Sequence, residues 1–290
     1  MPSSLLFLLL ARGAHALELE AVMRIVQHGD DRFSWKTMVP PCKIGHVFSA
    51  IQRNLSSSEA FVHGAFVECG VWRGGTSMAM IYADAGMARP RGKPSNRDFW
   101  LFDTFEGMPP PTAEDGTKAH NKLANPKKVK ARDAARWTNG GDGSAYTASD
   151  GTKRWNYGPR HIVEANVKST GVDMNRVHFV QGKVEDTLHR DAPSFASLPA
   201  RIALLRLDTD FYTSTKAEFA VLAPRLVIGG VLIVDDYCRW QGARTATDEY
   251  LKEHGHEFEI IIDQGRSNYC KTPQQGEICF AAIRKAAPRS

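Results

Sequence analysis

The sequence predicts an α/β fold in which a mostly parallel sheet of seven strands carries helices on both faces, with a helical extension at the N-terminus. Two observations predict it. From residue 64 onward, short apolar segments typical of buried strands alternate with segments of helical apolar spacing. The strand segments are almost continuously apolar, as expected when helices cover both faces of a parallel sheet.

Seven segments have the strand pattern. The first, at 66–69, follows a glycine, and the fifth is entered through Gly229 and Gly230. The last two segments have no helix between them, so we expect one of them to run antiparallel. The predicted strands are 66–69, 99–102, 177–180, 202–207, 231–234, 258–262 and 278–283.

Helical spacing of apolar side chains separates most of these strands. The fourth predicted helix has Pro159 in its first turn and stops at Gly171, as helix boundaries often do. The predicted helices are 18–27, 44–55, 76–88, 159–170, 215–226 and 245–254. We therefore expect an N-terminal helical extension or lid over 1–63 and one α/β domain over 64–290. Between about 110 and 156 the pattern dissolves into Pro, Gly, Lys and Asn, which indicates a long loop insertion.

Composition excludes several classes of protein. With 42% hydrophobic residues and a net charge of +5 over 290 residues, the chain is not dominated by disorder. No apolar run approaches the ~18 residues that span a membrane. No basic residue precedes the apolar run at 5–10, so we expect no signal peptide. Five cysteines without a C-x-x-C pair predict neither a disulfide framework nor a zinc site, and fit a cytoplasmic protein.

The basic character of the chain is concentrated in one region. The densest run of Lys and Arg lies between residues 118 and 136 and ends at the glycine-rich run 140–143. Interleaved Asn, Ala, Pro and Gly favour a solvated loop over a nucleic-acid patch. We therefore expect neither nucleic acid nor a membrane as a partner.

Acidic residues follow four of the first five predicted strands. Glu68 lies at the end of the first strand, Asp103 ends the second, Asp208 and Asp210 follow the fourth, and Asp235 and Asp236 follow the fifth. Ligands of open α/β sheets bind beyond the carboxyl ends of the strands, so these acids are expected at one edge. Acids that repel one another persist there when a cation or the hydroxyls of a ligand offset the repulsion.

A glycine-rich turn follows the first strand. Gly70 and Gly74 permit a tight turn and a close approach of a ligand to the backbone. Trp72 stands where a dinucleotide-binding motif has its middle glycine, which argues against an NAD-dependent enzyme and for a smaller ligand. The alternative is a turn that binds nothing.

Two sites follow from this pattern. Asp103 is expected to accept the two hydroxyls of a ribose, with a helix cap as the alternative. The aspartates after the fourth and fifth strands offer hard oxygen ligands for a cation such as Mg²⁺ or Ca²⁺. The alternative there is that Asp210 only caps the following helix.

Five ordered segments of this sequence resemble the motifs of the macrocin O-methyltransferase family. These enzymes are class I, S-adenosylmethionine- and metal-dependent methyltransferases with a Rossmann-like fold, and they act on sugar hydroxyls of antibiotics. The segments are FVECGVWRGGTS (66–77), FDTFEGMP (102–109), VQGKVEDTL (180–188), LRLDTDFYTST (205–215) and GGVLIVDDY (229–237). The resemblance covers roughly residues 60 to 285. The stretch from 118 to 154 looks like an enlarged insertion, and the first 35 residues contain none of these motifs.

The resemblance implies roles for individual residues. A Mg²⁺ or Mn²⁺ ion is implied on Asp208, Asp235 and Asp236, with Asp210 as general base. The expected S-adenosylmethionine site comprises Glu68, Gly70, Val71, Trp72, Gly74, Thr76, Ser77, Asp103, Thr104, Gly182, Glu185, Asp186 and Asp208. The resemblance suggests a homodimer or larger homo-oligomer. The implied acceptor is a small molecule, most simply a glycosylated natural product methylated on a sugar hydroxyl.

Aromatic residues near the metal motifs are the predicted acceptor contacts, because sugars stack on aromatic faces. These are Tyr212, Tyr237 and Trp240. Two other functions compete with methyl transfer. The D-x-D pattern at 208–210 also occurs in metal-dependent nucleotide-sugar glycosyltransferases, but that interpretation explains neither Asp235–Asp236 nor the glycine-rich turn. A non-catalytic S-adenosylmethionine-binding protein would have no need of all four aspartates.

Overall fold

A computed structural model describes residues 22, 36–37, 39, 41–55, 62–88, 96–124, 146–147, 151, 153–261 and 281–284. The sheet has the order β5-β2-β1-β6-β7-β9-β8. Its strands are β1 (Ala65–Cys69), β2 (Phe99–Asp103), β5 (Val177–Gln181), β6 (Ile202–Leu207), β7 (Leu226–Val234), β8 (Phe258–Ile260) and β9 (Ala281–Arg284). The first five in chain order are parallel, and β9 is antiparallel to both of its neighbours. The predicted seven-stranded, mostly parallel sheet is confirmed.

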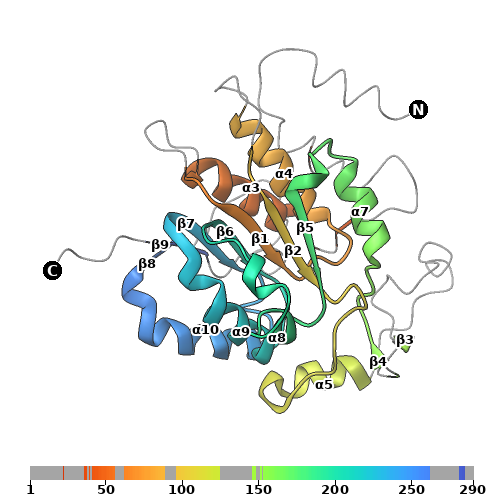
Figure 1. The fold of residues 1–290 in the computed structure, drawn as a ribbon. Coiled ribbons are helices and arrows are strands. Elements are labelled where there is room, and N and C mark those ends of the chain that lie inside the picture. The colour runs from red at the N-terminus through yellow and green to blue at the C-terminus, as the bar shows by residue number, and fades with distance from the viewer. Residues whose placement is uncertain are drawn as a thin grey trace.

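Helices cover both faces of this sheet (Figure 1). On one face lie α3 (Pro41–Leu55), α4 (Gly75–Ala88) and α7 (Arg160–Lys168). On the other lie α8 (Val184–Thr187), α9 (Tyr212–Val221) and α10 (Gln241–His254). Short 3₁₀ turns are η2 (Ala113–Asp115), η3 (Met174–Arg176), η4 (Phe195–Ser197), η5 (Ala223–Arg225) and η6 (Gly255–Glu257). Among the described residues, none of the helices combines the length and apolarity that crossing a bilayer requires.

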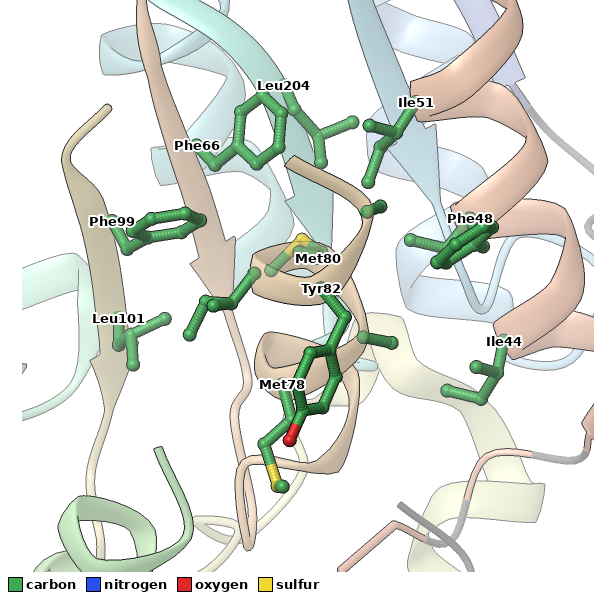
Figure 2. Packing of buried hydrophobic residues seen from close by; sticks show 14 of the residues in the cluster. Ile44, Phe48, Ile51, Phe66, Met78, Met80, Tyr82, Phe99, Leu101 and Leu204 are labelled. Carbon is green, nitrogen blue, oxygen red and sulfur yellow. The ribbon is translucent and has the colours of Figure 1, made fainter. Parts of the chain in front are cut away.

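The larger apolar core joins the N-terminal helix α3 to the sheet. Figure 2 shows Ile44 and Phe48 of α3 on one side of α4, and Phe66 of β1 and Phe99 of β2 on the other side. The Phe66 and Phe99 rings meet edge to face with their centroids 5.7 Å apart. Burying each such side chain contributes about 1.5–3 kcal/mol. The α3 helix is thus held firmly against the sheet domain.

The opposite face carries a second core and a small satellite. Phe219 of α9 stacks on Tyr250 of α10 with ring centroids 4.5 Å apart. Near the carboxyl ends of the strands, Trp155, Phe211 and Trp240 form a separate buried cluster. Phe211 meets both tryptophan rings close to edge-on. This cluster ties three chain segments together beside the predicted ligand edge.

The expected loop over about 110–156 contains structure that the sequence did not predict. The helix α5 (Gly116–Ala124) lies within it, followed by a hairpin of β3 (Tyr146–Thr147) and β4 (Lys153–Arg154). The helix was missed because Ala119 is the one apolar side chain of α5 in a buried cluster, among the residues whose burial is described. Of the helix predicted at 18–27, only residue 22 is described, and it is helical. Cys238 is disulfide-bonded, which the scattered cysteines did not indicate.

Candidate active site

A cavity of about 400 Å³ opens at the carboxyl ends of the parallel strands. Most of the predicted site residues line it: Gly70, Val71, Trp72, Thr76, Asp103, Thr104, Gly182, Glu185, Asp208, Asp210, Asp235, Asp236 and Trp240. The structure therefore brings the glycine-rich turn and all four metal-motif aspartates to one cavity. Residues that sequence reasoning did not name for the site also line it, among them Lys43, Met108 and Arg239.

Six predicted site residues lie outside the cavity lining. They are Glu68, Gly74, Ser77, Asp186, Tyr212 and Tyr237. Glu68 and Ser77 are buried and bonded to each other beneath the cavity. The Tyr212 and Tyr237 hydroxyls instead donate to acids of α10, at 2.8 Å to Glu249 and 2.7 Å to Asp248.

Asp103 fixes the shape of the glycine-rich turn. Its Oδ2 accepts from the backbone N–H groups of Val71 at 2.7 Å and Trp72 at 2.9 Å, and its Oδ1 accepts from that of Phe105 at 2.7 Å. Trp72 has a positive φ of 49°, an unusual conformation for a bulky residue that these bonds help to hold. Burial raises the pKa of Asp103, while the backbone donors oppose the shift. Oδ2 thus accepts two backbone N–H groups, whereas Oδ1 accepts one and keeps a lone pair for a ligand.

Gly70 brings the turn against the end of β6. Its φ is +84°, and a Cβ there would overlap the backbone carbonyl of Asp208. The backbone N–H of Asp208 donates to the carbonyl of Cys69 at 2.9 Å. Glycine at this position therefore sets how closely the turn after β1 approaches the first aspartate of the acidic group.

Three carboxylates converge on one point of the cavity. Asp208, Asp210 and Asp236 each offer a carboxylate oxygen, and these oxygens lie within 4.8 Å of one another. Asp210 has a φ of +68°, which turns the chain directly after β6. Burial raises the pKa of Asp210 to about 6, with neighbouring Asp208 adding to the shift. Burial and the proximity of Asp210 raise the pKa of Asp236 well above its usual range. A cation at this point would offset the crowding.

Asp235 has different neighbours from the other three aspartates. Its Oδ1 lies 3.0 Å from Nη2 of Arg206, and its Oδ2 lies 2.8 Å from Nζ of Lys43. Burial alone would raise its pKa, but Arg206 and Lys43 outweigh burial and lower the pKa of Asp235 to about 2. Burial opposes the charge of Lys43 too, yet Asp235 and Asp236 raise the pKa of Lys43 above its ordinary value. Both partners are thus charged at neutral pH.

Arg206 lies beneath the acidic edge and links three acids. Its guanidinium contacts Glu68 at 2.8 Å, Asp208 at 2.9 Å and Asp235 at 3.0 Å, and its side chain has no exposed surface. Burial raises the pKa of Glu68 to about 7, although Arg206 and Ser77 favour its charged form. A charged residue inside the apolar strand 202–207 was the sequence signal for Arg206.

Two further buried acids support the loops around the cavity. Asp115 accepts from the backbone N–H of Tyr212 at the start of α9, at 2.7 Å, and from that of Thr112, also at 2.7 Å. A Cβ on Gly242 would overlap the Asp115 carboxylate, so this contact requires glycine there. Glu218 accepts from the hydroxyl of Thr209, the middle residue of the D-x-D motif, at 3.0 Å. Asp115 gave no sequence signal, because it lies in the segment expected to be a loop.

Several known proteins resemble this chain. The family model described as macrocin-O-methyltransferase (TylF) matches residues 15–135 and 144–269. An 8-demethyl-8-(2,3-dimethoxy-alpha-L-rhamnosyl)-tetracenomycin-C 4'-O-methyltransferase of Streptomyces olivaceus is 33% identical over 67% of this chain and 60% of its own length. Demethyldecarbamoylnovobiocin O-methyltransferase of Streptomyces niveus is 30% identical over 69% of this chain and 63% of its own length. The matched part thus spans about three fifths of these relatives.

A solved structure shows the same fold. That of the O-methyltransferase NovP superposes with a TM-score of 0.62 at 22% identity, covering 93% of this chain and 99% of that one. The family model matches the glycine-rich turn, Asp103 and all four aspartates of the acidic edge. The chain therefore belongs to the macrocin O-methyltransferase family.

Proposed function

We propose that this protein is an S-adenosylmethionine- and divalent-cation-dependent O-methyltransferase that acts on a small-molecule hydroxyl, most specifically a sugar hydroxyl of a glycosylated natural product. One observation carries the proposal: a single cavity joins the glycine-rich turn held by Asp103 to the four-aspartate edge. The relatives' names support the reaction and the acceptor class, since they name O-methyltransferases of a rhamnosyl-tetracenomycin C and of demethyldecarbamoylnovobiocin.

The donor half of the cavity fits a nucleoside. Gly70, Val71 and Trp72 present backbone against it, and Asp103 at the end of β2 keeps a lone pair on Oδ1 for a ribose hydroxyl. Gly182 and Glu185 line the neighbouring wall after β5, where the adenine would lie. When bound, S-adenosylmethionine supplies a methyl group already activated on a sulfonium. The chain's own task is to hold that group in line with the acceptor oxygen.

The acidic edge fits a divalent cation. Hard carboxylate oxygens are the ligands that Mg²⁺ and Mn²⁺ take. We assign Asp208 and Asp236, two of the three converging carboxylates, to the cation. Asp235 is proposed as the third ligand from the family resemblance, and Asp210, the third converging carboxylate, is kept as the general base. When bound, the cation supplies Lewis acidity toward the acceptor hydroxyl. These aspartates hold positions set by Arg206 beneath them, which contacts both Asp208 and Asp235.

Asp210 is the proposed general base. It lines the cavity beside the other aspartates, and burial raises its pKa to about 6, so it is a carboxylate at neutral pH that can still take a proton. Asp210 removes the proton of the acceptor hydroxyl as the oxygen bonds to the methyl carbon and the carbon–sulfur bond breaks. Trp240 lines the same cavity and offers an aromatic face to a sugar.

A labelled-methyl assay tests this proposal. Glycosylated and phenolic acceptors are screened with methyl-labelled S-adenosylmethionine, with and without a chelator. The proposal predicts label in a sugar hydroxyl ether that disappears with chelator and returns with Mg²⁺. A calorimetric titration against UDP-sugars accompanies the screen. Binding of a UDP-sugar but not of S-adenosylmethionine would instead support the glycosyltransferase alternative.

A further inference from the structure

The segment before the sheet domain contributes to the cavity. The carbonyl of Lys36 accepts from the backbone N–H of Gly75, at the start of α4, at 2.7 Å. Thr37, Val39 and Lys43 then form part of the cavity lining. A segment outside the sheet therefore lines part of the cavity, and its Lys43 places a positive charge beside the acidic edge.

Lys43 holds Asp235 by two hydrogen bonds. Its Nζ donates to Oδ2 of Asp235 at 2.8 Å and to the backbone carbonyl of Asp235 at 2.9 Å. Its side chain is 12% exposed and that of Asp235 is 4% exposed. Because Arg206 occupies Oδ1, both oxygens of the proposed third cation ligand have a cationic side chain as a neighbour.

We propose that Lys43 and the divalent cation compete for Asp235, so that Lys43 sets the affinity of the cation site and couples the N-terminal helix α3 to its occupancy. This inference rests on the proposed function. It goes beyond it by giving the N-terminal extension a defined effect on the cation.

Lys43 and the cation compete because two positive charges cannot share one Asp235 oxygen without strong repulsion. A Mg²⁺ ligand oxygen lies about 2.0–2.1 Å from the ion, so the ion and an ammonium group on the same oxygen repel each other at short range. Of the two cationic neighbours, Arg206 is enclosed on all sides, whereas Lys43 lies at the cavity wall on a flexible four-carbon stem. Lys43 is therefore the group that withdraws when the cation binds.

The test is calorimetric titration of the full-length, metal-free protein with Mn²⁺ alone. Replacing Lys43 by Met removes the competing charge, and we expect Mn²⁺ to bind more tightly, on the order of tenfold. Lys43→Arg keeps the charge and should stay near the wild-type Kd. Lys252→Met removes an equal charge from the far end of α10, on an exposed side chain, and should also leave the Kd unchanged.

Hydrogen exchange of α3 provides a second measurement that needs no activity. Mn²⁺ should speed exchange in the first turns of α3 in the wild type, because Lys43 loses its anchor, and should not change it in Lys43→Met. Thermal melting checks that each variant is folded, and Lys43→Gln replaces Lys43→Met if that variant is not.

The outcomes separate this inference from the proposed function. Wild-type binding of Mn²⁺ with an equal or weaker affinity in folded Lys43→Met overturns the inference alone. Absence of Mn²⁺ binding in every variant overturns the cation site and the inference together. Tighter binding in Lys43→Met, with Lys43→Arg and Lys252→Met unchanged, supports both.

Discussion

The Nη1 atom of Arg206 lies 2.8 Å from Oε1 of Glu68, and neither side chain has any surface exposed to solvent. The pair joins β6 to β1 directly below the cavity. The same guanidinium contacts Asp208 and Asp235, so its positive charge partly neutralises the carboxylates of the acidic edge. Removing a buried charge that contacts three acids should lower the stability of the protein, and this effect can be measured.

Replacing Arg206 by Met should lower the free energy of unfolding by about 3–5 kcal/mol, because buried carboxylates lose their compensating charge. Urea unfolding measures the change. Mn²⁺ should restore more stability to this variant than it adds to the wild type, since the ion then neutralises Asp208 and Asp235. Arg206→Lys, which keeps the charge, should lose less. A Met variant as stable as the wild type would show that the guanidinium is not needed there.

Asp208 and Asp210 should respond differently to the same isosteric change. Asp208→Asn should lose both Mn²⁺ binding and methyl transfer, because it removes a cation ligand. Asp210→Asn should keep Mn²⁺ binding while turnover falls by about 10²–10⁴-fold, the usual contribution of a general base. Calorimetry and labelled-methyl transfer measure the two properties separately. Full activity of Asp208→Asn without added metal would rule out the proposed cation site.

The pH dependence of methyl transfer should show the protonation of Asp210. Burial raises the pKa of this carboxylate to about 6. A base acts in its deprotonated form, and a cation beside it lowers its pKa, so kcat/KM should fall as pH drops through a value below about 6 and reach a plateau above it. The profile is measured with the cation saturating at each pH, so that loss of metal does not mimic loss of the base. An acid limb of kcat/KM that is unchanged in Asp210→Asn is the result that this role does not allow.

Asp115 should stabilise the backbone at Thr112 and at the start of α9 without changing the affinity for the methyl donor. Asp115→Ala leaves the backbone N–H groups of Tyr212 and Thr112 without their partner, so the free energy of unfolding should fall by about 1–3 kcal/mol. Gly242→Ala should act similarly by displacing the Asp115 carboxylate. Donor affinity, measured by calorimetry with S-adenosylhomocysteine, should stay near wild type. The exposed Asp191→Ala is the matched control. Donor affinity that falls with stability would argue for a general structural role.

Asp103 should matter most on the donor side. Asp103→Ala removes the acceptor of three backbone N–H groups and the proposed ribose contact, so donor affinity should fall by at least about tenfold. Mn²⁺ affinity should change little, because Asp103 is not among the converging carboxylates. The two titrations on one variant separate these effects. Unchanged donor affinity would mean that the turn after β1 does not form the donor site.

The fold followed from the sequence because apolar strands and helical spacing are local patterns. The strand predicted at 202–207 matches β6 residue for residue, and the expected antiparallel strand is β9. Strand β7 begins at 226 instead of 231, since Gly229 and Gly230 lie inside it and not before it. The helix α9 begins at Tyr212 instead of 215, with Phe211 as its N-cap residue.

The contacts that complete the site were not predictable, because they join residues far apart in the chain. Lys43 and Asp235 are separated by 192 positions, and Asp115 and Tyr212 by 97. A lone lysine in a helix and a lone aspartate in a polar segment carry no periodic signal. The strand ends, by contrast, place acids at one edge by topology alone, and this is why the four aspartates could be expected together.

The proposed function requires that one cavity holds the methyl donor and the divalent cation side by side. Nuclear relaxation of the S-adenosylmethionine methyl protons in the presence of the protein and Mn²⁺ measures this proximity, because the unpaired electrons of Mn²⁺ speed the relaxation of nearby protons. Strong enhancement is expected with the wild type and should be lost in Asp208→Asn, although the donor still binds. A bound donor whose methyl protons relax no faster when the wild-type protein carries Mn²⁺ would rule out this arrangement.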